Sequence, residues 1–297
     1  MTVLTPYARE ELDTVPESLV LEVWDGNGAP DVDLAGVDFY VPPYFSREGV
    51  GLLEKLPSLR VVQTQTAGVD DIRDLIPAGV TLCNARGVHD ASTSELAVGL
   101  MLAAQRHLDD FVRAQTEARW DQRRVPSLAD RTVLILGYGS IGEAVERRLA
   151  GFEVDIVRVA SKAREGVHGV DELPELLPRA DIVVVLVPLT DATRGLVDAA
   201  FLGRLRDGAT LVNVARGAIV DTDALLAELQ SGRLRAALDV TDPEPLPAEH
   251  PLWHAPGVII TPHVGGATSA MQPRMRRLLS AQLRRYAAGE QLANIVD

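Results

Sequence analysis

Three polar residues in the second half of the chain each follow a short apolar run. Arg216 comes after "LVNVA", Glu244 after "LDVTDP" and His263 after "VIITP". A guanidinium group binds a carboxylate, an imidazole titrates near neutral pH, and a carboxylate beside the imidazole tunes its protonation. Each residue alone is more typical of a surface charge or a hydrogen-bonded structural side chain. Taken together, they predict proton transfer on a substrate that carries a carboxylate.

A glycine-rich stretch, "LILGYGSIGEAVE", indicates which cofactor would accompany that chemistry. It ends an apolar run and begins a helical one, and its G-x-G-x-x-G pattern comprises Gly137, Tyr138, Gly139, Ser140, Ile141 and Gly142. In that context glycine lets the backbone approach a pyrophosphate placed on the helix N-terminus. The motif predicts dinucleotide binding, with a bare tight turn as the alternative.

The chain from residue 131 onward alternates apolar runs with helical patterns. Short, near-continuous apolar runs are typical of parallel strands buried on both faces, and they occur at 132–137, 154–159, 181–187, 209–214, 235–240 and 257–262. Within this region "DTDALLAELQSG" predicts a helix capped by Asp221 and ended by Gly232. We therefore expect a six-stranded doubly wound sheet, whose ligands bind outside the carboxyl ends of its strands.

The first 90 residues predict a second α/β layer, with strands at "LVLEVW", "VDFYV", "LRVVQTQ" and "VTLCN". The stretch "STSELAVGLMLAAQRHLDDFVRAQ" predicts one long helix that links the domains and starts with a capping box of Ser92 and Glu95. A last helix ends at Gly289 and is expected to return to the first domain.

Length and composition restrict the classes of function. A chain of 297 residues exceeds the usual size of a single core, so two domains are expected. A net charge of -13 argues against a protein that coats nucleic acid or an anionic membrane. The single cysteine, Cys83, excludes an internal disulfide and a cysteine-based zinc site, and no metal site is predicted. Without a signal-peptide pattern or a membrane-length apolar run, the chain is expected to be cytoplasmic.

Several longer stretches resemble the D-isomer-specific 2-hydroxyacid dehydrogenase family: "GYGSIG", "VPLTDATRGLV", "LVNVARGAIVDTDAL", "ALDVTDPEPLP", "HPLW" and "TPHVGGAT". "TQTAGVDDI" and "NARGVHDASTSELAVGLMLA" extend the resemblance over essentially the whole chain. It implies two Rossmann-like doubly wound domains with the active site in the cleft between them. The discontinuous substrate domain would comprise residues 1–95 and 268–297, and the dinucleotide-binding domain residues 96–267. The resemblance also implies a homodimer, with the helix after residue 92 as the expected contact.

The same resemblance assigns roles to individual residues. Arg216 would bind the carboxylate and carbonyl of a 2-keto acid, His263 would transfer the proton, and Glu244 would pair with His263. The "AGVD" turn would hold the substrate carboxylate through backbone N–H groups, and further residues would line the substrate or the cofactor: Ala67, Gly68, Val69 and Tyr44 for the substrate, and Pro188, Thr193, Val214, Ala215, Asp239 and Gly265 for the cofactor. Among these, Asp239 would contact the nicotinamide carboxamide.

The residue at position 160 predicts a preference for NADP(H), although NAD(H) stays possible as a coenzyme. NAD-specific Rossmann domains carry an acidic residue about 20 positions after the glycine motif, where it binds the ribose hydroxyls. Here Ala160 stands at that position, and Ser161, Lys162 and Arg164 follow it, with Arg158 as a further cation. A hydroxyl and positive charges suit a 2′-phosphate, whereas a solvated basic loop is the alternative.

Three related functions remain as alternatives. Formate dehydrogenase replaces the glutamate with glutamine, so Glu244 argues against it. A phosphate group would prefer clustered cations, yet "VPPYFSREGV" supplies only Arg47, and no regulatory domain is expected after the last helix, so phosphoglycerate dehydrogenase is less favoured. A co-repressor that uses the fold as a nucleotide-gated interaction module would retain all three polar residues. Glyoxylate, hydroxypyruvate and bulkier 2-keto acids all stay open as substrates.

Overall fold

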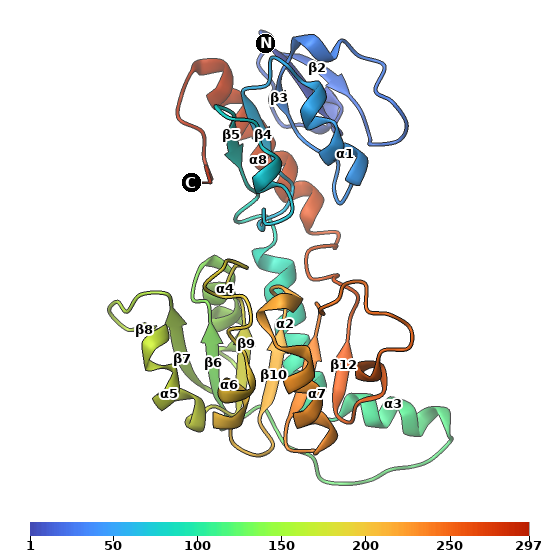
Figure 1. Cartoon of the computed structure of the whole chain (residues 1–297), viewed down its shortest axis with the longest axis vertical. Coiled ribbons are helices and arrows are strands. Elements are labelled where there is room, and N and C mark those ends of the chain that lie inside the picture. Colours follow the sequence, from blue (N-terminus) through green and yellow to red (C-terminus); the bar gives the residue numbers. More distant parts are fainter. Residues whose placement is uncertain (297) are drawn as a thin grey trace. The chain divides into compact units, whose positions relative to one another are not determined.

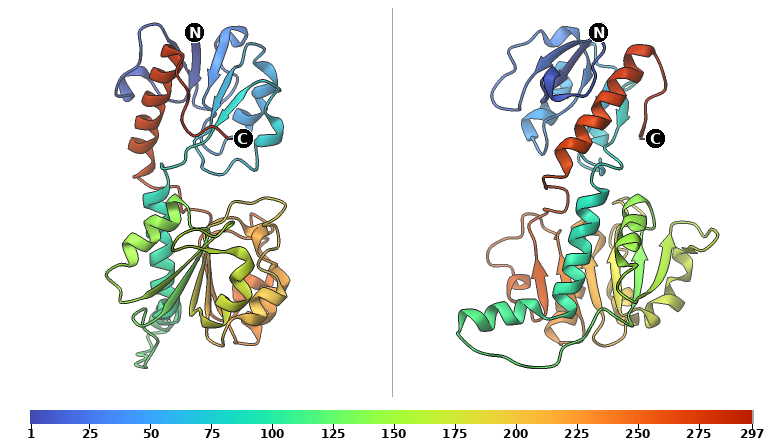
Figure 2. Two further views of the ribbon diagram at one scale, coloured as in Figure 1. Left: turned by 90° about the vertical axis from the view of Figure 1, so that its left-hand side faces the viewer. Right: turned by 180° about the vertical axis from the view of Figure 1, so that it is seen from behind.

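The computed structural model describes residues 1–296, which form two compact units. One unit is Asp90–Ala267, and the other combines Met1–His89 with the chain from Thr268 onward. Figures 1 and 2 show both units, each with its own sheet. None of the helices in residues 1–296 combines the length and the apolarity needed to cross a membrane.

The second unit is built on a parallel sheet of seven strands, in the order β12-β11-β10-β9-β6-β7-β8. The strands are β6 (Thr132–Leu136), β7 (Asp155–Ala160), β8 (His168–Gly169), β9 (Ile182–Val185), β10 (Thr210–Asn213), β11 (Arg235–Leu238) and β12 (Val258–Ile260). Six of them occupy the predicted apolar runs. The expectation of six strands was one short, because β8 has only two residues and no apolar run; it pairs with the end of β7.

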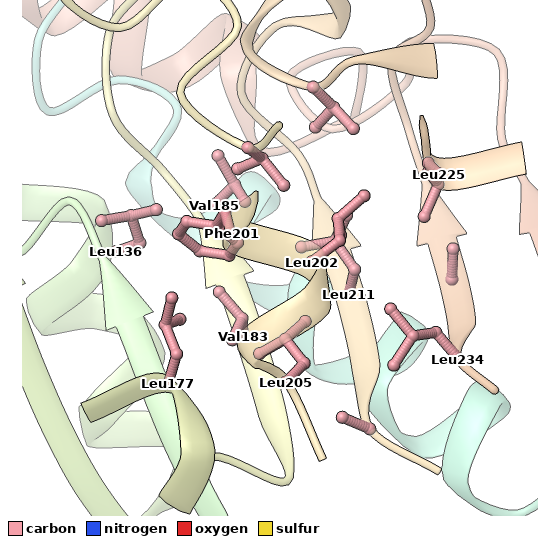
Figure 3. Close-up of a cluster of buried hydrophobic side chains, with 14 of the residues drawn as sticks. Leu136, Leu177, Val183, Val185, Phe201, Leu202, Leu205, Leu211, Leu225 and Leu234 are labelled. Carbon is pink, nitrogen blue, oxygen red and sulfur yellow. The ribbon is translucent and has the colours of Figure 1, made fainter. Parts of the chain in front are cut away.

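Helices cover both faces of this sheet because alternate side chains of each strand point to opposite faces. On one face Leu134 and Leu136 pack with α5 (Leu173–Leu176), α6 (Ala199–Arg204) and α7 (Thr222–Gln230). Figure 3 shows part of this core, in which Val183, Val185 and Leu211 meet Phe201 and Leu202 of α6. On the other face Val133 and Ile135 pack with α4 (Ser140–Leu149) and with α2 (Asp90–Gln105), which lies in front of the sheet in the right-hand view of Figure 2. The sheet is therefore doubly wound, as predicted.

The expectation of a single long helix after residue 92 was wrong. The chain forms α2 and then α3 (Leu108–Thr116), and His107 between them adopts a left-handed backbone with a φ of 51°. Because a left-handed residue cannot continue a right-handed helix, the direction changes there. The predicted capping box was also wrong, since α2 begins at Asp90 and Ser92 lies inside its first turn. By contrast, Asp221 caps α7 by accepting a hydrogen bond from the N–H of Ala224 at 3.0 Å, as expected.

The first unit contains a parallel sheet of five strands, in the order β2-β1-β3-β4-β5. The strands are β1 (Thr2–Thr5), β2 (Val20–Val23), β3 (Val37–Tyr40), β4 (Val61–Gln63) and β5 (Thr81–Cys83). The sequence analysis missed β1, because four residues at the N-terminus show no clear periodicity. Its helices are α1 (Arg47–Gly51) and α8 (Met271–Ala288), and α8 ends at Gly289 as predicted. The return of α8 to this unit is confirmed, because its Met275 and Leu279 pack with Val3 and Phe39.

Short 3-10 helices complete the two units. They are η1 (Arg9–Glu11), η2 (Leu34–Gly36), η3 (Leu53–Lys55), η4 (Arg73–Leu75), η5 (Val170–Glu172), η6 (Leu177–Arg179), η7 (Gly217–Ile219) and η8 (Pro251–His254).

Candidate active site

The glycine motif forms the turn between β6 and α4. Gly137 has a φ of 109°, and a Cβ atom there would lie 2.6 Å from the backbone of Leu186 and Val187. A Cβ on Gly142 would lie 2.8 Å from the carbonyl oxygen of Gly137, whereas a Cβ on Gly139 would meet no protein atom within 4 Å. The first and third glycines therefore permit close packing within the protein, and the second leaves space over the loop.

That space suits a pyrophosphate. Gly139 is the N-cap residue of α4, and no side chain caps the first-turn N–H groups. Uncapped N–H groups and the positive end of the helix dipole together bind anions. The loop thus has the properties that a dinucleotide requires.

His263 and Glu244 form a hydrogen-bonded pair beyond the carboxyl ends of β11 and β12. Nδ1 of His263 lies 2.6 Å from Oε1 of Glu244. A hydrogen bond from His263 is the main cause that lowers the pKa of the Glu244 carboxyl, against the opposing effect of burial, and the charge of Arg216 lowers it further. Glu244 is therefore a carboxylate at neutral pH, and it accepts the hydrogen bond that fixes the imidazole ring.

The backbone that carries His263 is held by Asp239, which follows β11. The Asp239 carboxylate is 2% exposed. It accepts hydrogen bonds from the hydroxyl of Thr261 at 2.5 Å, from the N–H of Val264 at 2.9 Å and from the N–H of Gly265 at 2.8 Å. His263 has a φ of 52°, a left-handed conformation that is uncommon for residues other than glycine. Asp239 thus sustains a strained turn, and its contact with a nicotinamide stays a prediction.

Arg216 follows β10 at a turn that Asn213 closes. The side chain of buried Asn213 donates to the carbonyl oxygen of Arg216 at 2.9 Å and accepts from the N–H of Ala215 at 3.1 Å. The Arg216 guanidinium donates to the carbonyl oxygen of Ala215 at 2.8 Å. The sequence analysis did not single out Asn213, although a polar residue at the end of an apolar strand was a signal for such a brace.

The basic segment after β7 is shaped by a tight turn. The backbones of Arg164 and Val167 exchange two hydrogen bonds, at 2.9 and 2.8 Å. The guanidinium of Arg164 then donates to the carbonyl oxygen of Tyr138 in the glycine loop at 2.8 Å. Ser161 and Lys162 are exposed on the same segment. The sequence analysis expected Arg158 to be a further cation for the 2′-phosphate. Its guanidinium instead forms an ion pair with Glu146, a residue that the sequence analysis overlooked.

The remaining predicted cofactor residues lie in loops that follow other strands. The hydroxyl of Thr193 donates to the carbonyl oxygen of Pro188 at 2.6 Å and closes the loop after β9. Val214 and Ala215 directly follow β10, whereas Ile141 lies in the first turn of α4 and packs, partly buried, against the core. All of these positions lie at the carboxyl side of the sheet, where doubly wound folds bind ligands.

In the first unit, the predicted "AGVD" turn presents backbone donors. Its carbonyl groups are occupied: Asn84 donates to the oxygen of Ala67 at 2.9 Å and Thr66 to that of Gly68 at 2.8 Å. Within residues 1–296, the N–H groups of Ala67, Gly68 and Val69 donate no hydrogen bond to another protein group. Successive N–H groups of this kind form an anion-binding nest.

A cavity of about 430 Å³ lies beside this turn in the first unit. Its lining includes Pro42–Arg47 and Thr64–Thr66, so the predicted substrate residue Tyr44 lies in its wall. The centres of the Tyr44 and Phe45 rings are 4.3 Å apart. Phe45 has a left-handed backbone with a φ of 53°, and the residue is 59% exposed. A strained and exposed aromatic residue at a cavity is typical of a binding site.

Comparison with known proteins identifies the family. A family model described as "D-isomer specific 2-hydroxyacid dehydrogenase, NAD binding domain" matches residues 98–265. The chain belongs to the D-isomer specific 2-hydroxyacid dehydrogenase family. This dehydrogenase is therefore an oxidoreductase that acts on the CH–OH group of 2-hydroxy acids with a nicotinamide cofactor.

Individual relatives refine the comparison. A glyoxylate reductase of Thermofilum pendens is 33% identical over 261 residues, which cover 83% of the dehydrogenase and 77% of that protein. A D-3-phosphoglycerate dehydrogenase of Methanocaldococcus jannaschii is also 33% identical, but the match covers 83% of this chain and only 49% of that protein. A family member from Xanthobacter autotrophicus Py2, solved in complex with NADPH and MES, is 32% identical with a TM-score of 0.84, covering 100% of the dehydrogenase and 98% of that chain.

Proposed function

We propose that this dehydrogenase interconverts non-phosphorylated 2-keto acids and D-2-hydroxy acids with NADP(H) as its preferred coenzyme. The hydrogen bond between His263 and Glu244, 2.6 Å long and beside Arg216, is the observation that carries the proposal. It combines a titratable group, a carboxylate that tunes it and a cation at the edge of the sheet where ligands bind.

NADPH, held by the glycine loop and the segment after β7, would supply the hydride for reduction of the carbonyl carbon. Arg216 binds the substrate carboxylate and polarises the carbonyl oxygen, since a guanidinium presents two parallel donors. Protonated His263 delivers the proton to that oxygen, and Glu244 stabilises the imidazolium before transfer. In the reverse direction, neutral His263 removes the hydroxyl proton.

The first unit is proposed to hold the substrate. The N–H groups of Ala67, Gly68 and Val69 suit the carboxylate of the substrate, and the cavity lined by Tyr44 suits its side chain. Arg47 is the only lysine or arginine in the lining of this cavity. The lining also contains Asp71, whose negative charge offsets that of Arg47. A phosphate group would require more positive charge, so glyoxylate, hydroxypyruvate and bulkier 2-keto acids are favoured over a phosphorylated substrate.

The coenzyme preference is supported by the segment after β7. Ala160 leaves the ribose position without an acid that would repel a 2′-phosphate. Ser161 and Lys162 are exposed there, and Arg164 is anchored on the glycine loop. Lys162 and Arg164 form no ion pair with a carboxylate in the described chain. The relative solved with NADPH supports the same preference.

A panel of 2-keto acids with each reduced coenzyme, followed by nicotinamide absorbance, tests the function. We expect turnover of at least one keto acid, and a kcat/KM for NADPH at least about tenfold above that for NADH, equivalent to ~1.4 kcal/mol. Ala160→Asp combined with Lys162→Ala is expected to reverse the order. Equal efficiencies in the wild type, or a preference for NADH, contradict the coenzyme assignment, whereas no turnover of any keto acid contradicts the function.

We further propose a cytoplasmic homodimer. Leu108 and Val112 of α3 are exposed, and Trp120 in the following loop is 91% exposed. Neighbouring exposed apolar side chains of this kind are typical of an interface. Cys83 is buried and unbridged, which suits a reducing compartment. Light scattering on the wild type and on Val112→Glu tests the assembly, for which we expect a dimer and a monomer respectively; cell fractionation tests the compartment.

A further inference from the structure

Two arginines lie within contact range of the ring of Tyr138, the tyrosine of the glycine motif. The guanidinium carbon of Arg158 is 5.7 Å from the centre of the Tyr138 ring, and that of Arg164 is 5.8 Å from it. Both distances fall within the range of cation–π attraction. Arg164 also donates to the carbonyl oxygen of Tyr138 at 2.8 Å, so ring and backbone of one residue hold the same guanidinium.

The two arginines differ in their charge balance. Nε of Arg158 donates to Oε2 of Glu146 at 2.8 Å, and its Nη2 donates to Oε1 of the same carboxylate. This fork is bidentate, and it lowers the pKa of the Glu146 carboxyl. Arg164, in contrast, forms no ion pair with any carboxylate of residues 1–296. The positive charge of Arg158 is therefore neutralised, and that of Arg164 is not.

Tyr138 is itself held in place by this ion pair. Its hydroxyl donates to Oε2 of Glu146, the oxygen that also accepts from Nε of Arg158. Glu146 lies on α4, Arg158 on β7 and Tyr138 in the loop between β6 and α4. Three elements thus fix the ring on which Arg164 rests, and the tight turn at Arg164 and Val167 fixes its backbone.

We propose that Tyr138, Glu146 and Arg158 form a platform that selects NADP(H) by positioning Arg164 for the 2′-phosphate. Arg158 acts in this platform as the partner of Glu146 and does not bind the phosphate. The proposal rests on the coenzyme preference proposed above. It explains why an acidic residue is compatible with a phosphate site: Arg158 neutralises the charge of Glu146, and of the two arginines beside the ring only Arg164 presents an unbalanced charge. Without Arg158, the Glu146 carboxylate would repel the phosphate and attract Arg164 to itself.

The decisive variants separate charge balance from packing. Arg158→Met keeps an extended apolar side chain but leaves Glu146 without its partner. We expect the ratio of kcat/KM for NADPH to that for NADH to fall by roughly two- to fivefold, the size of one interaction between partly exposed charges. The double variant Arg158→Met with Glu146→Gln removes the repulsive charge as well, and it should recover most of the wild-type ratio.

A matched pair of variants tests the role of the Tyr138 ring. Tyr138→Phe keeps the aromatic face and should retain most of the preference, whereas Tyr138→Leu should lose it. Affinity for 2′,5′-ADP relative to 5′-ADP, measured by calorimetry on each full-length variant, reports the phosphate contact independently of turnover.

The outcomes distinguish this proposal from the one on which it rests. A wild type that prefers NADPH, together with an Arg158→Met variant of unchanged ratio, overturns the platform alone. A double variant that fails to recover the ratio overturns it too, because a packing defect would then explain the loss. A wild type without any preference for NADPH or for 2′,5′-ADP overturns the coenzyme assignment and the platform together.

Discussion

In this dehydrogenase, Nδ1 of His263 lies 2.6 Å from Oε1 of Glu244, although 19 positions separate the two residues in the chain. A carboxylate can only accept, so Nδ1 donates, and in the proposed mechanism Nε2 is the atom left to exchange a proton with the substrate oxygen. The same bond lowers the pKa of Glu244, which keeps the carboxylate charged when the imidazole is protonated. The pair therefore fixes the orientation of the imidazole ring.

The first prediction concerns His263. His263→Ala should lower kcat for keto-acid reduction by roughly 10² to 10⁴, the usual contribution of a positioned acid. His263→Asn is the matched control, because asparagine tolerates the left-handed backbone at a φ of 52° and isolates the chemistry from the strain. Stopped-flow reduction with saturating coenzyme measures the step. An alanine or asparagine variant of wild-type rate would end the assignment of His263 as the acid.

Arg216 provides a second test. Arg216→Lys keeps the charge but loses the planar fork, so kcat/KM for the keto acid should fall by roughly ten- to a hundredfold. Steady-state kinetics with the keto acid varied measure this loss, and coenzyme affinity and the unfolding temperature serve as controls. Wild-type kinetics in the lysine variant would favour a structural role for the hydrogen bond between Arg216 and Ala215.

The pH dependence should change in Glu244→Gln. The hydrogen bond from His263 lowers the pKa of the Glu244 carboxyl, so the carboxylate persists into acidic solution and is lost only as the pH falls through that lowered value. The wild type should therefore lose kcat/KM on this acid limb, whereas Glu244→Gln should lack the limb and should have a lower kcat at neutral pH. Kinetics with one keto acid from neutral to acidic pH measure both effects, and a variant with the wild-type rate and the wild-type acid limb would contradict the pairing.

The lowered pKa of the Glu244 carboxyl determines how the stability change in Glu244→Gln should depend on pH. A carboxyl whose pKa is lower in the folded state stabilises the protein above its unfolded pKa, and this contribution is lost as the pH falls through the lowered value. Glu244→Gln should therefore reduce the free energy of unfolding at neutral pH and change it little in strong acid. Because the side chain is 40% exposed, solvent screening keeps this effect small. Urea unfolding at both pH values measures it.

The glycine loop allows a comparison of two alanine variants. Gly137→Ala places a methyl group 2.6 Å from the backbone of Leu186 and Val187 at a φ of 109°, so it should destabilise the fold by about 2–4 kcal/mol. Gly139→Ala meets no protein atom within 4 Å and should leave the unfolding temperature almost unchanged. It should nevertheless weaken NADPH binding by about tenfold or more, since the methyl group occupies the space over the loop. Equal stability losses with unaltered coenzyme binding would argue against a pyrophosphate at Gly139.

Much of the second unit could be predicted from local sequence. Six strands were identified because buried parallel strands are apolar on both faces. The start of α7 and the end of α8 were identified because Asp221 and Gly289 are residue types with specific capping geometries. The polar residues at strand ends were found for a related reason. Parallel strands place their carboxyl ends at one edge, so Arg216, Glu244 and His263 were expected near one another before any distance was known.

Other features depended on contacts between distant residues. The break at His107 separates α2 from α3 within one continuous helical pattern, and β8 exists only because two residues meet the end of β7. Arg158 was grouped with the phosphate-binding cations by its position, yet Glu146 on α4 takes its charge. Local sequence determines which side chains a segment offers, because propensity and periodicity act over a few residues. Which partner each charge meets is decided by tertiary structure, since an ion pair forms wherever folding brings opposite charges within contact.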